Sequence, residues 1–164
     1  MDIYINKWWG NYIGGSDDAL LLLDYFGTNK KQEISLNEIL EDIKLNNLLK
    51  LNSFEEGDLF FEIENNYVPH FDMATNVLID LSTILLESLK NGNVTINNLD
   101  EYSKYDKTFS IHTTKEDIKN LKNSLDYFIV NANSFEIAEF MAEKDFNDFI
   151  SDCKEVSNEL SVYC

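Results

Sequence analysis

The sequence predicts a helix-dominated α+β fold, with about five helices packed on a small sheet of three to four short strands. Several segments repeat apolar residues at helical spacing, most clearly residues 73–90, whereas shorter segments alternate apolar and polar residues. Hydrophobic residues make up 44% of the chain and aromatic residues 13%, which is enough for a buried core. Because 164 residues fit one domain, we expect residues 1–164 to form a single domain.

A strand and a loop are expected at the start of the chain. Residues 2–7 alternate apolar and polar side chains, which is typical of a strand. Residues 8–16 contain two tryptophans and three glycines. Because glycine adopts backbone conformations that other residues resist, we expect a structured surface loop here.

The next predicted element is a helix at residues 17–26. Ser16 or Asp17 can cap its N-terminus, where acidic residues also suit the helix dipole. Four consecutive leucines at 20–23 leave this helix almost no polar face over one turn, so we expect it to be largely buried. Gly27 is typical of a helix end.

The middle of the chain combines a capped helix with an aromatic-rich strand. Ser35 and Glu38 form a capping box, and apolar residues keep helical spacing over residues 36–49. Residues 59–64 alternate apolar and polar side chains and are rich in aromatics, so they predict a strand.

The clearest helix in the sequence spans residues 73–90. Asp72 is its expected N-cap, and the Asn-Gly pair that follows is expected to end it. Two short strands and two helical regions are expected after it, at residues 94–96, 108–112, 114–131 and 135–162, the last broken near 142–144.

The charge of the chain restricts its partners. The formal net charge is −17, and all 13 basic residues are lysines. Since a polyanion would be repelled and arginine is absent, we expect no direct binding to nucleic acid. The acidity favours a basic protein partner, or serves solubility alone. No segment has the ~18 apolar residues that span a bilayer, and the N-terminus lacks a signal-peptide pattern, so we expect a cytoplasmic protein without membrane contact.

Known catalytic motifs are missing from the sequence. No Gly-Lys-Ser/Thr follows the glycines near Ser16, and neither GxGxxG nor GxSxG occurs. His70 and His112 stand alone, which makes a metal site improbable. Cys153 falls on the apolar face of its helix, and Cys164 is expected to be a free thiol. We therefore expect no catalytic residues, no metal and no cofactor.

An acidic segment near the middle of the chain is the first candidate binding site. It contains five carboxylates and no lysine, namely Glu55, Glu56, Asp58, Glu62 and Glu64. Aromatic residues lie around them, at Phe54, Phe60, Phe61, Tyr67 and Phe71. Aromatics supply desolvated anchors, and carboxylates pair with the lysines and arginines of a partner. Core packing is the alternative role of the aromatics, and we expect one of Phe60 and Phe61 to be buried.

Further candidates have simpler structural explanations. A second acidic run at residues 136–159 lies opposite an apolar stripe, so much of it is expected to be a solvated helix face. Asp17 and Asp18 are second choices for partner contact, although helix N-termini favour acids in any case. Adjacent residues of an extended segment face opposite sides, so at most one of Trp8 and Trp9 points inward and the other is an interface candidate.

Residues 8–18, with the leucine-rich helix that follows them, resemble small acidic immunity proteins encoded beside bacterial polymorphic toxins, including contact-dependent growth inhibition systems. The similarity extends through residues 73–92 and 140–142 and so covers most of the chain. Because immunity proteins differ in fold, the resemblance implies a role rather than an architecture. It implies a protein that binds its cognate toxin one to one and needs no catalysis.

The favoured hypothesis is an immunity protein that neutralises a basic nuclease toxin. Nucleases have basic clefts for phosphate, and an acidic surface that occludes such a cleft meets the same charge. One alternative is a mimic of DNA charge that inhibits host DNA-binding proteins, which predicts several unrelated basic partners. Another alternative is an enzyme that uses paired carboxylates, with or without a divalent metal, and predicts a deep pocket with at least two acids of raised pKa.

Overall fold

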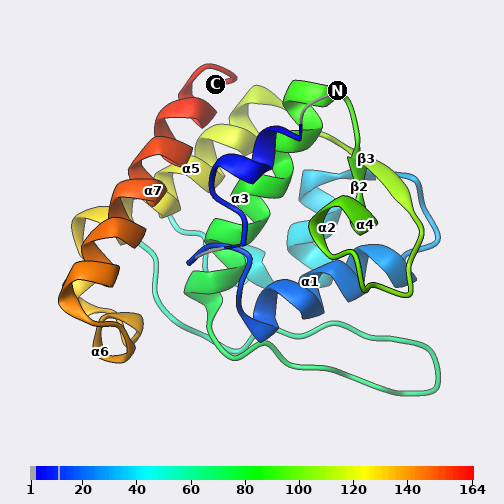
Figure 1. Cartoon of the computed structure of the whole chain (residues 1–164), viewed down its shortest axis with the longest axis horizontal. Coiled ribbons are helices and arrows are strands. Elements are labelled where there is room, and N and C mark those ends of the chain that lie inside the picture. Colours follow the sequence, from blue (N-terminus) through cyan, green and yellow to red (C-terminus); the bar gives the residue numbers. More distant parts are fainter. Residues whose placement is uncertain (1–2, 11) are drawn as a thin grey trace.

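The computed structural model describes residues 3–10 and 12–164, and within them the fold is α+β (Figure 1). The helices are α1 (Asp17–Thr28), α2 (Leu36–Asp42), α3 (Ala74–Asn91), α4 (Ile96–Leu99), α5 (Lys115–Val130), α6 (Ile137–Phe140) and α7 (Glu143–Ser161). Short 3-10 turns are η1 (Tyr4–Lys7), η2 (Leu45–Asn47) and η3 (Ala132–Ser134), and the strands are β1 (Glu33–Ser35), β2 (Val94–Thr95) and β3 (Thr108–His112). Since five of the helices described have seven or more residues and the strands form one three-stranded sheet, the predicted fold class is confirmed.

Helix α3 lies at the centre of the molecule, with α5 and α7 on one side and α1, α2 and the sheet on the other (Figure 1). Every residue from Ala74 to Ser88 except Asn76 is buried. Helix α1 is less deeply packed than its leucines predict, because Leu22 and Leu23 are buried whereas Leu20 is 48% exposed. Helix α3 therefore forms the centre of the core.

The sheet covers one side of α3. Its strand order is β1-β3-β2, with β1 parallel to β3 and β2 antiparallel to β3. The backbone N–H of Ile111 in β3 donates to the hydroxyl of Ser88 in α3 at 2.8 Å, which ties the sheet to the central helix. Phe109 of β3 stacks on Phe26 of α1, with ring centroids 4.2 Å apart.

Three helix starts follow the local capping signals of the sequence. The hydroxyl oxygens of Ser16, Ser35 and Thr114 accept hydrogen bonds from the backbone N–H three residues later, in α1, α2 and α5. The expected break in the last helical region is also confirmed, because α6 ends at Phe140 and α7 starts at Glu143.

The strand expected at residues 2–7 is wrong for residues 3–7, and residue 2 lies outside the described residues. Residues 4–7 form η1, whose turn is closed where the Ile5 carbonyl accepts from the backbone N–H groups of Trp8 and Trp9. The Ile5 side chain is fully buried in the core, where η1 packs against α3. Residues 8–10 and 12–16 do form the expected loop, and residue 11 of that loop is not described.

Other element boundaries also differ from the expectation. Helix α2 ends at Asp42 rather than near residue 49, because Lys44 takes a left-handed conformation with φ of 70°. Helix α1 continues to Thr28, and Gly27 lies inside its last turn. A Cβ at Gly27 would lie 2.3 Å from the Tyr105 ring, so this glycine serves close packing rather than helix termination.

Candidate functional site

Residues 53–72, which we call the arm, leave the helical body between η2 and α3 (Figure 1, lower part). The strand expected at 59–64 is not part of the sheet, because these residues make only isolated bridges with residues 67–70. The Ile63 N–H donates to the Tyr67 carbonyl at 2.8 Å, and the Phe71 N–H donates to the Leu59 carbonyl at 2.9 Å. Pro69 lacks an N–H and so interrupts a regular ladder between the two sides of the arm.

The arm has a buried side and an exposed side. Its buried residues are Phe54, Leu59, Phe61, Pro69 and Phe71. Phe61 is thus the core member of the Phe60–Phe61 pair, and its ring packs edge-on against Tyr25 of α1. The carboxylates of Glu55, Asp58, Glu62 and Glu64 are on the exposed side. Buried and more exposed residues therefore alternate over residues 59–64, as in a strand, although these residues do not pair with the described sheet.

An exposed tyrosine lies at the far end of the arm. Tyr67 is 61% exposed and follows Asn65 and Asn66, both of which have positive φ. Asparagine tolerates this left-handed conformation, so the Asn-Asn pair makes the tight turn at the tip. In the sequence, this Asn-Asn pair is the signal that indicates a turn, and therefore an exposed position, next to Tyr67.

Glu56 behaves differently from the other acids of the arm. Its carboxylate accepts hydrogen bonds from the Ala74 N–H at 2.6 Å, from the Thr75 N–H at 3.1 Å and from the Thr75 hydroxyl. These are the first residues of α3, so Glu56 caps a helix from 18 residues upstream. The contact also joins the beginning of the arm to its end.

Asp18 completes this cap from α1. Its carboxylate accepts from the N–H groups of Asp72 and Met73 at 2.6 and 3.0 Å, and from the Asn76 side chain at 3.0 Å. The expected N-cap, Asp72, is wrong, because the N-cap position is Met73 and both capping carboxylates come from elsewhere in the chain. We call Asp18 and Glu56, with the N–H groups that they accept, the α3 clasp.

Exposed contacts with lysine or histidine hold three of the other arm carboxylates only loosely. Glu55 lies 3.7 Å from Lys50, Glu64 lies 3.5 Å from Lys30, and Asp58 lies 2.9 Å from His70. Both members of each pair are more than half exposed, and such pairs contribute about 0–1 kcal/mol. A partner can therefore displace Lys50, Lys30 and His70 from these carboxylates at little cost.

A hollow of about 400 Å³ lies at the base of the arm. Its lining combines carboxylates, aromatic rings and two hydroxyl groups, from Phe54, Glu55, Glu56, Tyr127, Ser134, Phe135 and Glu136. Carboxylates beside aromatic faces suit a lysine or arginine side chain, which gains both ion pairing and cation–π contact.

Neither tryptophan of the N-terminal loop is a free anchor. Trp8 is 2% exposed, and its indole N–H donates to Glu155 of α7 at 2.9 Å. Trp9 is half-buried, and its indole N–H donates to the Leu99 carbonyl at 3.2 Å. Both rings therefore fasten the loop to the body of the protein.

Part of the second acidic run also has internal partners. Along α7, Asp145 accepts from the Tyr12 hydroxyl at 3.0 Å, and Glu159 lies 3.6 Å from Lys7. The hydrogen bond to Asp145 raises the pKa of Tyr12. Asp152 lies on the same helix, and partial burial raises its pKa. Asp145 and Glu159 hold the N-terminal segment in place, which the sequence pattern alone did not indicate.

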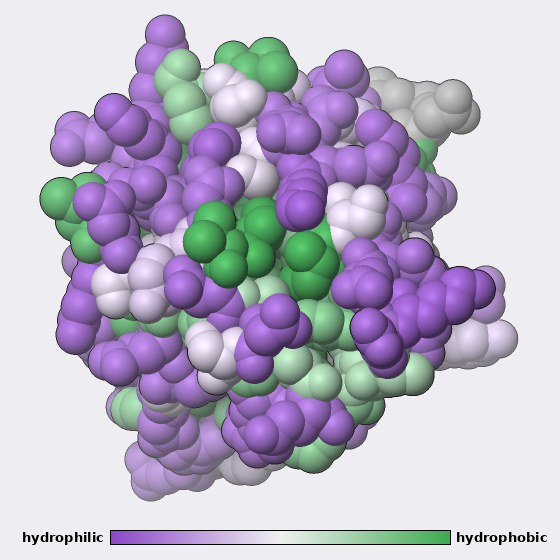
Figure 2. Space-filling view, turned by 90° about the vertical axis from the view of Figure 1, so that its left-hand side faces the viewer, coloured by the Kyte–Doolittle hydropathy of each residue, from purple (hydrophilic) through white to green (hydrophobic). Residues whose placement is uncertain are grey.

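Figure 2 shows the side of the molecule formed by α5 to α7, where hydrophobic residues gather in a small patch among hydrophilic ones. A hollow between α5 and α7 is lined in part by Ile129, Val130 and Ile150, and Val130 is 81% exposed. No carboxylate lines this hollow, so it is separate from the acidic arm.

The described residues contain no group of three or more His, Cys, Asp or Glu side chains arranged to hold a metal ion. Asp80 of α3 is the acid most perturbed by burial, which raises its pKa to about 8. Its carboxylate accepts from the Gly14 N–H at 3.0 Å, and the residue is only 2% exposed. A carboxyl group in the core cannot reach a substrate, so Asp80 has a structural role.

Fold and surface together define an acidic α+β domain whose exposed carboxylates and one exposed tyrosine are carried on a braced arm. The family model of Immunity protein 68 matches residues 4–160, and the chain belongs to this family. This is a family of immunity proteins of toxin systems and not a family of enzymes, so the chain acts against a cognate toxin. Searches of curated proteins and of solved structures gave no match.

Within residues 3–10 and 12–164, we find no helix with the length and apolar character needed to cross a bilayer.

Proposed function

We propose that the chain neutralises its toxin by covering the active cleft of the toxin with the acidic arm. The toxin is a basic nuclease domain, and the complex has one copy of each protein and forms in the cytoplasm. The observation that carries this proposal is the exposed side of the arm, where Glu55, Asp58, Glu62 and Glu64 accompany Tyr67.

Charge and shape of the arm suit a cleft that normally holds a phosphate backbone. The carboxylates replace phosphates as partners of the lysines and arginines of the toxin. Tyr67 provides a rigid, amphipathic side chain of the kind that dominates binding energy in many interfaces. The net charge of −17 adds long-range attraction, which can raise association rates to ~10⁸–10⁹ M⁻¹s⁻¹.

Other predicted contact residues take different parts in this proposal. Glu56 and Asp18 hold the base of the arm through the α3 clasp, and Trp8 and Trp9 hold the N-terminal loop. Asp17, which is exposed beside the clasp, remains a second-choice contact. A braced arm loses little conformational entropy on binding, which favours tight association.

Co-expression with the toxin domain encoded by the adjacent gene tests the proposal. We expect a one-to-one complex by size-exclusion chromatography with light scattering, protection of cells, and loss of nuclease activity in a plasmid-digestion assay. A complex whose toxin does not cleave nucleic acid would contradict the nuclease assignment. Absence of both a complex and protection would contradict the function as a whole.

Selectivity separates this proposal from general mimicry of DNA charge. An immunity protein binds its own toxin far more tightly than unrelated basic proteins, because shape and aromatic contacts add to charge. Comparable affinity for several unrelated basic proteins, lost together as salt rises, would instead support a charge mimic.

A further inference from the structure

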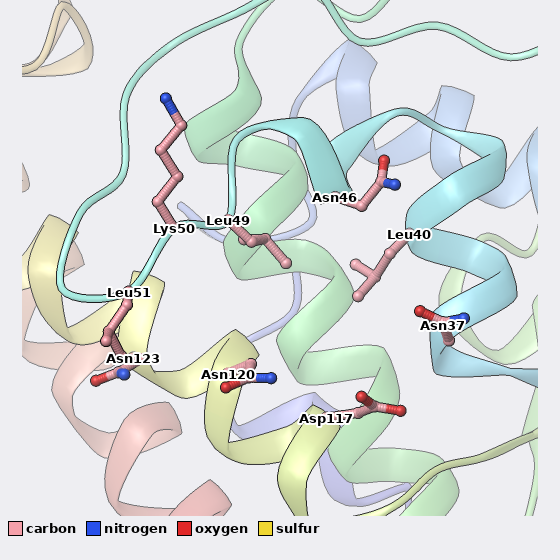
Figure 3. Close-up of a pocket in the computed structure, with 9 residues that line it drawn as sticks. All are labelled: Asn37, Leu40, Asn46, Leu49, Lys50, Leu51, Asp117, Asn120 and Asn123. Carbon is pink, nitrogen blue, oxygen red and sulfur yellow. The ribbon is translucent and has the colours of Figure 1, made fainter.

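A groove of about 340 Å³ lies between α2 and α5 next to the base of the arm (Figure 3). We call it the asparagine groove, because four asparagine side chains line it, from Asn37, Asn46, Asn120 and Asn123. Figure 3 shows Asn120 and Asn123 on α5 along one wall, whereas Asn37 and Asn46 come from α2 and η2 on the other. Both walls therefore present carboxamides to the same groove.

None of these four side chains has a hydrogen-bond partner in the part of the chain that the structure describes. Each carboxamide has two N–H donors and an acceptor oxygen. Four such carboxamides can pair with a ligand whose hydrogen-bond donors and acceptors alternate along its length. The main chain of an extended polypeptide has this pattern, with one N–H and one carbonyl on each residue.

Three leucines supply apolar contact in the groove, namely Leu40, Leu49 and Leu51. Leu51 is 79% exposed, which leaves an apolar side chain uncovered beside the carboxamides. Apolar contact with free amides on both walls suits a peptide, whose side chains bury apolar area while its main chain forms hydrogen bonds.

Other ligand classes fit the groove less well. A phosphate group requires concentrated positive charge, but Lys50 is the one cation in the lining and Asp117 is also present. The lining contains no aromatic ring on which a sugar or a nucleic-acid base could stack. A polypeptide remains as the class whose hydrogen-bonding pattern the groove complements.

We propose that the asparagine groove binds an extended segment of the toxin through the toxin's main chain. This inference rests on the proposed function, because it takes the toxin as the partner. Position supports the assignment, since Leu51 lies two residues before the arm and Asn123 is one helical turn from Tyr127, which lines the hollow at the base of the arm. Groove and hollow thus draw on neighbouring turns of α5 and on neighbouring stretches of the chain that leads into the arm, which places them within reach of a single partner.

Binding of a nuclease-inactivated toxin domain to Asn120→Ala/Asn123→Ala tests the groove. Alanine is a better helix former than asparagine, so α5 remains stable in this variant. We expect Kd to rise by about 10- to 100-fold, because several main-chain hydrogen bonds are lost. The matched control is Asn158→Ala, which makes the same change at an exposed position of α7 and is expected to keep the wild-type Kd.

Salt dependence distinguishes the groove from the arm. Carboxamide contacts are neutral, so the fold-loss of the double variant should be the same at 50 and 500 mM NaCl, whereas losses from arm carboxylates should shrink with salt. If the double variant binds the toxin with the same Kd as wild type, the groove proposal is overturned and the proposed function still stands. Failure of the wild-type protein to bind the toxin overturns both.

Hydrogen exchange of the toxin identifies the bound element. We expect one continuous toxin segment to gain amide protection in the wild-type complex and to lose it with Asn120→Ala/Asn123→Ala, while protection elsewhere in the interface is kept. A uniform loss of protection across the interface, or none in any continuous segment, contradicts main-chain recognition by the groove.

Discussion

The carboxylate of Glu56 accepts hydrogen bonds from both the backbone N–H and the hydroxyl of Thr75. This contact joins the start of the arm to the first turn of α3, and Ala74 donates to the same carboxylate at 2.6 Å. One side chain therefore caps the central helix and closes the base of the loop that carries the exposed acids.

Removing this cap should lower global stability. We expect Glu56→Ala to reduce the free energy of unfolding by about 1–3 kcal/mol, because the N–H groups of the buried residues Ala74 and Thr75 lose a charged acceptor. Urea denaturation followed by circular dichroism measures the change. The neighbouring exposed acid provides the control, since Glu55→Ala should stay within about 0.5 kcal/mol of wild type. Equal losses in the two variants would contradict a capping role.

Asp18 and Asp17 are adjacent in sequence but differ in their contacts. Asp18 is 3% exposed and accepts from Asp72, Met73 and Asn76, whereas Asp17 is exposed. We expect Asp18→Ala to cost about 2–4 kcal/mol, and Asp17→Ala about 0.5 kcal/mol through the dipole of α1. Thermal and urea unfolding of both variants test this difference, and a larger effect at Asp17 would refute it.

Asp80 should make stability depend on pH. Burial raises its pKa to about 8 in the folded protein, against about 3.9 in an unfolded chain. Between these values the folded state holds a proton that the unfolded state releases, so stability falls as pH rises from about 4 to 8, by at most about 1.4 kcal/mol per pH unit. Burial also raises the pKa of nearby Cys153, which keeps its thiol neutral over this range.

Urea unfolding of wild type and Asp80→Asn at pH 5, 7 and 9 isolates this effect. We expect the stability of the variant relative to wild type to increase steadily with pH, since asparagine keeps an acceptor for the Gly14 N–H but cannot ionise. Asp148→Asn, at an exposed position, should show no such trend. Parallel pH profiles for wild type and Asp80→Asn would mean that Asp80 titrates normally in the folded protein.

Alanine substitutions at two loop glycines distinguish the effect of steric contact from that of backbone strain. Gly14 has φ of +78°, and a Cβ there would lie 2.2 Å from the Trp9 ring, whereas Gly10 has φ of +100° and open space around it. Both alanine variants carry left-handed strain, but only Gly14→Ala also displaces the Trp9 ring. We expect Gly14→Ala to lose about 1–2 kcal/mol more than Gly10→Ala by urea denaturation. Equal losses would show that Trp9 moves aside freely.

Elements with local signals were predictable from the sequence. The caps of α1, α2 and α5 depend on residues three positions apart, and the periodicity of α3 spans the whole helix. The α3 clasp was not predictable, because Asp18 meets residues 54 to 58 positions away and no short-range pattern encodes that distance. Alternation gave the correct buried side of the arm but not its pairing, since alternation predicts burial and not a neighbouring strand.

The candidate site was predictable to a similar extent. Clustered acids without lysine located the arm, and Glu55, Asp58, Glu62 and Glu64 are indeed exposed on it. The same pattern could not separate Glu56, whose carboxylate is engaged by α3. The asparagine groove gave no sequence signal, because its amides come from α2, η2 and α5 and meet only in the folded chain.

We propose that the arm carboxylates, rather than the overall charge, direct binding to the toxin. The most direct measurement is the association rate constant of the toxin domain, by stopped flow at low and high salt, for Glu62→Gln/Glu64→Gln and for Glu101→Gln/Glu139→Gln. All four residues are exposed, and both double variants change the net charge equally. We predict that the arm variant associates several-fold more slowly at low salt and dissociates faster, while the control stays near wild type. Equal slowing in the two variants would contradict a dedicated acidic arm.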